Sequence, residues 1–348
     1  MTTSTWIDFL ENQGASCNSE QTEICFPATE NSNPHCLLMP LTDYALLSME
    51  GPDSETFLQG QASCDIRKLT PEQSLLGSNC TPKGNVISVF RLIMKQPHQL
   101  FLRISRSIKE PALANLQKYI VFSKADLADA SDQYVGLGLS GEGAEKLISA
   151  QFGSAPAASG EQLVVDDTII LRAPGTSPRY EIWLPLSGAP ALWSSLASQA
   201  IPCSSNEWRR QEIESGLALL DQQSVELYLP QMLNLQAAEG ISFDKGCYIG
   251  QEVITRLQFR GKLKKRLFRG KVSGALVPEP GMSLHTASRK GVGKVLAVAP
   301  SGHDSYELQA VIGQSSAEEN QLRLGEQDGP QVELLDLPYE IDPSLFER

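Results

Sequence analysis

The sequence predicts an α+β fold that ends in a small closed β-barrel. Two observations support this fold class. Between residues 75 and 104, apolar runs are separated by turn residues such as Pro82 and Gly84, which predicts antiparallel strands joined by hairpins. From about residue 257 onward, short strands alternate with frequent glycine and proline turns, as is typical of a small barrel.

The first two thirds of the chain mix helices and strands. Residues 5–13 predict a short amphipathic helix with Trp6, Ile7 and Leu10 on one face, whereas the polar residues 15–37 predict a surface loop. Strands are expected at 44–49, 75–80, 86–94, 99–104, 134–139, 163–171 and 179–184. Helices are expected at 55–59, from 111, at 141–152, at 190–199 and from 204 to 216.

The length of the chain predicts more than one folding unit. Single cores usually divide beyond roughly 250 residues, and this chain has 348. We expect an N-terminal helix and loop at 1–34, a main body at 35–256 and a barrel domain at 257–348, with a small-residue linker near 153–162 inside the main body. The barrel strands are expected at 263–273, 282–285, 291–298, 306–312 and 331–335.

The composition argues against several classes of protein. The chain is 41% hydrophobic and 20% charged, which is typical of globular proteins, and its net charge of −12 disfavours general nucleic-acid binding. No apolar run approaches the roughly 18–20 residues that span a bilayer. Residues 1–30 contain no Lys or Arg and five acids, unlike signal or transit peptides, so we expect no membrane contact and a cytoplasmic location.

The cysteines and histidines predict neither a disulfide framework nor a metal site. The seven cysteines are scattered and include no CxxC pair, and none of the four histidines lies in ligand spacing with another. We therefore expect free thiols and no dedicated metal site.

The densest set of chemically reactive residue types lies within residues 240–252, around Cys247. A free cysteine is most often a small buried hydrophobic residue. In a functional site, Lys245 could stabilise a thiolate, and Gly246 and Gly250 would let the backbone turn sharply and keep the sulfur accessible. No histidine lies nearby to activate a hydrolytic nucleophile, which favours redox or sulfur chemistry over acyl transfer.

A second candidate is the run from Arg256 to Lys271, which holds eight basic residues in sixteen and no acid. Such a run is commonly a solvated strand face. In a chain of net charge −12, it could instead bind the glutamate tail of a folate, an acidic partner or RNA.

A third candidate comprises Tyr44, Trp183 and Trp208. Core packing is the better explanation for any one aromatic residue, but an aromatic ring at a helix start or strand edge can also stack on a flat heterocycle. Glu181 lies on a strand whose side chains alternate between faces. Its carboxylate would either face solvent or hydrogen-bond the aminopyrimidine edge of a pterin.

Residues 245–252, Lys-Gly-Cys-Tyr-Ile-Gly-Gln-Glu, resemble the signature K-G-C-Y-x-G-Q-E of YgfZ-type folate-binding proteins, a branch of the glycine-cleavage T-protein (aminomethyltransferase) superfamily. The resemblance covers roughly residues 35–345. Further matching segments are 41–45, 57–65, 80–84, 118–123, 229–237, 240–243 and 258–266. The residues of this signature in the chain are Lys245, Gly246, Cys247, Tyr248, Gly250, Gln251 and Glu252.

The resemblance implies an aminomethyltransferase-like fold, in which two interlocked α+β subdomains surround a central channel that binds tetrahydrofolate, followed by a C-terminal β-barrel. It also implies a role in the assembly or repair of iron–sulfur enzymes, including enzymes that methylthiolate tRNA, through Cys247. Tyr44 and Trp208 fall at the two aromatic positions of the family's folate site, with Tyr44 replacing a more familiar tryptophan. Glu181 matches the T-protein glutamate that holds the pterin.

Two alternatives stay open from the sequence. One is a folate-dependent one-carbon (aminomethyl) transferase. T-proteins carry a catalytic aspartate after the strand at 99–104, where this chain reads Arg103-Ile-Ser-Arg-Ser107, and they read Phe-Ile-Gly-Lys-Glu at the cysteine motif, so both departures count against transfer. The other is a non-catalytic module that binds RNA or protein through Arg256–Lys271.

Overall fold

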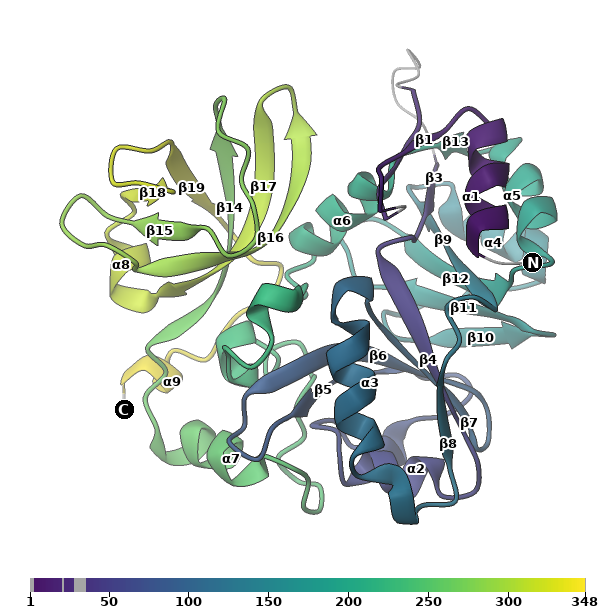
Figure 1. Ribbon diagram of the computed structural model, residues 1–348, viewed down its shortest axis with the longest axis horizontal. Helices are drawn as coiled ribbons and strands as arrows, with labels where there is room; N and C mark the ends of the chain where they lie inside the picture. The colour runs from purple at the N-terminus through teal and green to yellow at the C-terminus, as the bar shows by residue number, and fades with distance from the viewer. Residues whose placement is uncertain (1–2, 21, 28–35, 348) are drawn as a thin grey trace.

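The computed structural model describes residues 3–20, 22–27 and 36–347. Two β-sheets with associated helices form one side of the molecule, and a closed barrel forms the other (Figure 1). The predicted α+β class with a C-terminal barrel is therefore confirmed. None of the helices in these ranges has the length and apolar character needed to cross a membrane.

The first sheet has six strands in the order β10-β11-β12-β9-β3-β13. Its elements are β3 Leu37–Pro40, β9 Tyr134–Ser140, β10 Gln162–Val165, β11 Thr168–Ala173, β12 Arg179–Pro185 and β13 Ile201–Pro202, with helices α1 Thr3–Asn12, α4 Ala144–Phe152 and α5 Ala189–Ala197. The three helices lie together beside this sheet (Figure 1). Trp6 and Leu10 of α1 pack in the same core as Trp193 of α5 and Leu137 of β9, which confirms the predicted inner face of α1.

The second sheet has five antiparallel strands in the order β5-β6-β7-β4-β8. Its elements are β4 Tyr44–Glu50, β5 Leu75–Cys80, β6 Val86–Gln96, β7 Gln99–Ser105 and β8 Asp126–Asp129, with helices α2 Ser54–Gln59 and α3 Lys109–Gln117. Phe57 of α2 and Leu116 of α3 pack against Leu92 and Leu102 of the sheet. Gly84, at a φ of +79°, makes the predicted turn between β5 and β6.

The chain interlocks the two sheets because it crosses between them twice. Strand β3 of the first sheet leads through residues 41–43 into β4 of the second, and after β8 the chain returns to the first sheet at β9. The two sheets share one core. In it, Trp183 of the first sheet and Leu41, which follows β3, pack with Phe101 of the second sheet and with Trp208 of helix α6, Ser205–Glu214.

The barrel closes because its last strand pairs back to its first. Its order is β14-β17-β16-β15-β18-β19, and β19 pairs with β14. The elements are β14 Lys265–Ser273, β15 Ser283–His285, β16 Gly293–Gly302, β17 Ser305–Gly313, β18 Leu322–Leu324 and β19 Gln331–Leu335, with helix α8 Gln314–Glu318. The Gln309 side chain joins the barrel to the main body, since it donates to the Leu217 carbonyl at 2.7 Å and accepts from the Leu219 amide at 3.2 Å.

The remaining elements lie in connecting segments. They are the 3₁₀ turns η1 Ile66–Lys68, η2 Arg106–Ile108, η3 Ile120–Phe122, η4 Gln222–Ser224 and η5 Pro230–Leu233, and helices α7 Gln251–Arg260 and α9 Ser344–Glu347. Helix α7 spans the boundary expected between residues 256 and 257. Because domain boundaries usually fall in loops, we propose that the main body and the barrel divide within residues 261–264.

Two local expectations need correction, and one strand was not predicted. The strand predicted at 163–171 is a hairpin of β10 and β11, whose turn contains Asp166 at a φ of +52°. The loop predicted at 15–37 contains a short antiparallel pair, β1 Ser16–Cys17 and β2 Ile24–Cys25, and buries Ile24 in the first core. Residues 21 and 28–35 of that prediction lie outside the described residues. Strand β18 was not predicted because three residues carry no periodic signal.

Candidate functional site

The cysteine-containing segment lies along the loop that follows α2. The Ser63 hydroxyl donates to the Gly240 carbonyl at 2.6 Å, and the Ser242 amide donates to the Ser63 carbonyl at 2.8 Å. The Ile249 amide donates to the Gly60 carbonyl at 3.2 Å. These bonds hold both ends of the segment against one loop of the second sheet's body.

Lys245 anchors the middle of this segment. Its side chain is buried, and its ammonium donates to the carbonyls of Ala62 at 2.8 Å and Cys64 at 2.6 Å. The ammonium also lies 5.1 Å from the centre of the Tyr248 ring. Burial lowers the pKa of Lys245 to about 8, so the ammonium form still predominates at pH 7. The expectation that Lys245 stabilises a Cys247 thiolate is corrected, because its ammonium is committed to these inward contacts.

Cys247 is exposed, although its neighbours Lys245 and Tyr248 are buried. Burial raises the pKa of the thiols of Cys36, Cys64 and Cys80 to about 12, which makes them unreactive near neutral pH. The two exposed thiols of the chain are those of Cys25 and Cys247.

The two motif glycines differ in what the fold demands of them. Gly250 has a φ of +86°, and a Cβ there would lie 2.7 Å from the Thr81 carbonyl oxygen. A Cβ at Gly246 would meet no atom within 4 Å. Gly250 therefore makes the turn that ends the segment, whereas the expected steric need for Gly246 is not found.

Gln251 and Glu252 begin helix α7, for which Gly250 is the N-cap. The Gln251 amide lies 3.5 Å from the Lys245 carbonyl, a marginal hydrogen bond. Glu252 is exposed in the first turn, where the helix dipole favours a negative charge.

The three residues expected at a folate site, Tyr44, Trp208 and Glu181, are all buried, at 4%, 1% and 2% exposure. The Arg103 guanidinium covers the Tyr44 ring at 4.3 Å from its centre, and the Arg179 guanidinium covers the Trp208 ring at 4.2 Å. The structure thus brings the predicted residues into one region but covers both rings with arginine side chains.

Two buried ion pairs hold this region together. Arg103 pairs with Glu181 at 2.5 Å, and the Trp183 indole donates to the same carboxylate at 2.9 Å. Arg179 pairs with Glu212 at 2.5 Å, and Arg103 lies 3.8 Å from Glu212. We call these five side chains, with Tyr44 and Trp208, the buried charged cluster. In the sequence, Arg103 stood out only because it lies where T-proteins carry an aspartate. Its partner Glu181 is 78 positions away, so no local pattern indicates the ion pair.

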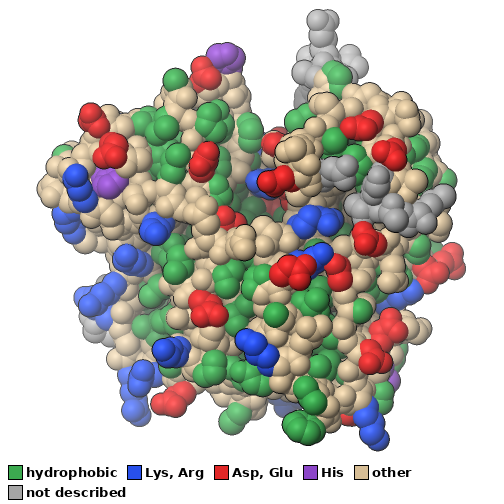
Figure 2. Space-filling model, in the orientation of Figure 1, with side chains coloured by type: hydrophobic (Ala, Val, Ile, Leu, Met, Phe, Trp, Pro, Cys, Tyr) green, Lys and Arg blue, Asp and Glu red, His purple; other side chains and the backbone are tan. Residues whose placement is uncertain are grey.

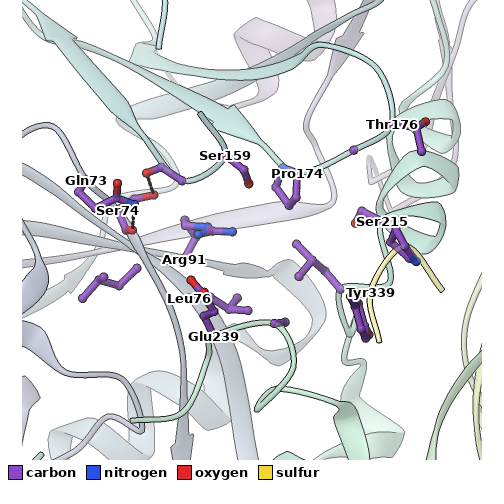
Figure 3. A pocket seen from close by; sticks show the side chains of 16 residues that line it. Gln73, Ser74, Leu76, Arg91, Ser159, Pro174, Thr176, Ser215, Glu239 and Tyr339 are labelled. Carbon is purple, nitrogen blue, oxygen red and sulfur yellow. Dashed lines mark hydrogen bonds between the residues drawn. The ribbon is translucent and has the colours of Figure 1, made fainter. Parts of the chain in front are cut away.

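Two cavities lie near the buried charged cluster. The first, of about 510 Å³, is lined by Arg91 of β6 with residues from the linker, the loop after β11 and the C-terminal segment (Figure 3). The second, of about 370 Å³, is lined by Tyr44, Arg106 and Arg209 among others. Arg103 links them, since it stacks on Tyr44 and lies directly opposite Arg91 in the β6–β7 ladder.

The sequence reasoning missed Arg91. A usable signal was present, because Arg91 stands as a cation inside the apolar strand at 86–94. Within the described ranges, no three His, Cys, Asp or Glu side chains gather in a way that could hold a metal ion.

The basic run does not form a single strand face, which was one of the explanations considered for it. Arg256 and Arg260 lie on α7, and the run continues through a loop into β14. Two members are engaged locally: Arg266 packs 3.8 Å from the Phe268 ring centre, and Arg269 pairs with Glu307 at 3.2 Å. Lys and Arg side chains gather on the side of the molecule below the barrel (Figure 2). The exposed members of the run are Arg256, Arg260, Lys262, Lys264, Lys265 and Lys271.

The chain has the fold of an aminomethyltransferase T. The solved structure of the glycine cleavage system aminomethyltransferase T from Bartonella henselae superimposes with a TM-score of 0.74, over 95% of this chain and 96% of that one. The two sequences are 16% identical, so the likeness is one of fold.

The sequence comparisons establish the family. The chain is 32% identical to the tRNA-modifying protein YgfZ of Pectobacterium carotovorum over 307 residues, which cover 87% of this chain and 92% of the relative. It is 36% identical to that of Colwellia psychrerythraea over 235 residues, covering 68% and 71%. No family model matches the chain. On this similarity the chain belongs to the YgfZ family.

Proposed function

We propose that this chain is a tetrahydrofolate-binding accessory factor that supports the assembly or repair of iron–sulfur enzymes, including enzymes that modify tRNA, and that it acts through Cys247. The family relatives are named tRNA-modifying proteins, and the fold matches an aminomethyltransferase. The seven free thiols suit a reducing compartment, which supports a cytoplasmic location.

The exposure of Cys247 on an anchored segment is the observation that carries this proposal. Lys245 fixes the backbone two residues before the thiol, and Gly250 ends the segment three residues after it. A thiol presented in this way can reach a sulfur species or a cluster on a partner protein without rearrangement of the fold. Lys245 would be a positioning residue, since it acts on the backbone rather than on the sulfur.

The residue types near the two cavities have the chemistry that a folate requires. Its flat pterin can stack on aromatic rings or guanidinium planes, and its carboxylates can pair with arginine. Both cavities fall within the range of about 300–1,000 Å³ that is usual for small-molecule sites. We propose that Tyr44, Trp208 and Glu181 hold the pterin, which requires Arg103 and Arg179 to move from the ring faces that they cover. Bound tetrahydrofolate would supply one-carbon or redox chemistry.

Calorimetric titration with tetrahydrofolate tests the folate proposal. Trp208→Phe shrinks the proposed stacking surface, and Trp193→Phe is the matched control because Trp193 is equally buried but lies in the first core. We expect the wild type and Trp193→Phe to bind alike and Trp208→Phe to bind about tenfold more weakly. A wild type that does not bind tetrahydrofolate would remove the folate role.

The aminomethyl-transferase alternative loses support from the Arg103–Glu181 pair. Arg103, which makes this pair, begins the segment Arg103–Ser107 where T-proteins carry the catalytic aspartate, and that segment contains no carboxylate. We therefore expect no formation of methylene-tetrahydrofolate from an aminomethyl donor, and robust turnover in that assay would reverse our preference.

We further propose that the exposed members of the basic run contact tRNA while an iron–sulfur enzyme is bound as a transient partner. Five of these cations, at Arg256, Arg260, Lys262, Lys264 and Lys265, lie within ten residues. None of their side chains has a hydrogen bond or ion pair within the described part of the chain, so these charged groups are available to phosphate groups.

A further inference from the structure

The charges of Arg91 and the buried charged cluster do not balance. Arg103 and Arg179 are each matched by a buried carboxylate, from Glu181 and Glu212 at 2.5 Å. Arg91 is a third cation close to the same two carboxylates and to Arg103. This group therefore contains three arginines and two glutamates.

Arg91 is the cation without a partner. Its guanidinium has no hydrogen bond or ion pair with any residue that the structure describes, although the side chain is half-buried. Burial and the neighbouring Arg103 both lower its pKa from the ordinary value. A desolvated charge without a counter-ion costs free energy, so its retention points to a ligand rather than to stability.

The guanidinium of Arg91 extends into the first cavity, between the walls that carry Ser159 and Leu76 (Figure 3). Two other polar groups of the cavity are engaged elsewhere: the Ser74 hydroxyl donates to the Gly160 carbonyl at 2.6 Å, and the Gln73 amide donates to the Ser74 carbonyl at 3.0 Å. The carboxylate of Glu239 also lines the cavity but forms no ion pair with Arg91.

We propose that the first cavity binds a carboxylate-bearing ligand and that Arg91 is the residue that pairs with its carboxylate. The planar guanidinium presents two parallel N–H donors, which match a carboxylate in a bidentate geometry. One ligand carboxylate paired with Arg91 would bring the group to three negative charges against three positive ones. The carboxylate can come from the glutamate portion of a folate or from a separate carboxylate metabolite, and neither source requires the other.

The test compares wild type with Arg91→Gln by calorimetry and thermal unfolding, using 5-formyltetrahydrofolate, pteroate, which lacks the glutamate, and sodium glutamate as probes. Arg67→Gln is the control, since Arg67 is an exposed arginine beside Asp65. If folate supplies the carboxylate, wild type binds it at least tenfold more tightly than pteroate, and Arg91→Gln removes that difference. If a separate carboxylate is the ligand, glutamate alone raises the melting temperature of wild type and not of Arg91→Gln.

A second readout separates loss of the site from loss of the fold. Because Arg91 is an uncompensated charge without ligand, ligand-free Arg91→Gln should melt at the same temperature as wild type or higher. The proposal is overturned if wild type responds to none of the three probes, or if Arg91→Gln binds each of them as wild type does. A melting temperature of ligand-free Arg91→Gln well below that of wild type would also contradict it, because Arg91 would then be structural.

Discussion

Two side chains only two positions apart play opposite parts in the cysteine motif. Lys245 is buried and pairs with two carbonyl oxygens, whereas Cys247 is exposed. The lysine fixes the position of the backbone, and this backbone holds the thiol of Cys247 at the surface. The motif therefore combines a structural residue with a residue available for chemistry.

We predict that Lys245→Met destabilises the protein in a pH-dependent way. The folded pKa of Lys245, about 8, lies below the unfolded value near 10.5, so the folded chain binds fewer protons than the unfolded chain between these values. The free energy of unfolding of wild type, relative to Lys245→Met, should therefore rise by about 1–2 kcal/mol from pH 7.5 to 9.5. Urea unfolding of both proteins at the two pH values measures this, and a constant or shrinking difference would disprove it.

The residue types of the site were readable from the sequence, but their directions were not. The octapeptide around Cys247 marked the candidate thiol. Nothing local indicates that Lys245 turns inward, because the carbonyls that it contacts, at Ala62 and Cys64, lie more than 180 positions away. The partner of Arg103 was hidden for the same reason.

At the scale of elements, one turn decides where the motif segment ends and where α7 begins. Gly250 caps α7 in a left-handed conformation and packs against the β5–β6 turn near Thr81 and Gly84. A side chain there would meet backbone atoms that cannot easily move. The segment that carries Cys247 thus depends on a contact with a hairpin of the second sheet.

We predict that Gly250→Ala destabilises the protein by at least about 2 kcal/mol, whereas Gly246→Ala changes the stability by less than about 0.5 kcal/mol. The first substitution combines an unfavourable φ with a 2.7 Å contact to the Thr81 carbonyl, and the second meets open space. Urea unfolding midpoints of the two variants provide the comparison. Equal losses of stability would mean that the turn does not constrain the segment.

Most elements followed from periodicity, and the exceptions have local causes. Strands β6, β7, β9 and β12 are long enough to show an apolar pattern. Helix α7 was missed although it is about as amphipathic as α1, because the run Arg256–Lys271 was considered as a strand face or an anion-binding patch and not as a helix. The two-residue turn between β10 and β11 was missed because Asp166 and Asp167 interrupt a continuous apolar run only briefly.

At the scale of the molecule, a strongly acidic chain keeps one concentrated exposed basic segment. The net charge is −12, yet the exposed members of the basic run face solvent beside the barrel. An acidic body with one basic segment favours an oriented contact with a polyanion over general adsorption.

We predict that tRNA binding weakens with salt and that Arg256→Gln/Arg260→Gln/Lys262→Gln reduces the slope of log affinity against log salt by about 2. The control is Lys290→Gln/Lys294→Gln, which removes two exposed barrel lysines outside the run and should leave the slope unchanged. Filter-binding measurements between about 50 and 200 mM salt give the slopes. If the triple variant keeps the wild-type slope, the basic run does not contact tRNA.

The central claim, that Cys247 carries the function, is tested most directly by complementation. A strain that lacks the protein would be given wild type, Cys247→Ala or Cys25→Ala, and the extent of iron–sulfur-dependent tRNA modification would be measured at matched protein levels. Both substitutions remove an exposed thiol, so both variants should fold. We predict that Cys25→Ala restores modification to the wild-type level and that Cys247→Ala leaves it near that of the empty vector. Full restoration by Cys247→Ala would contradict the claim.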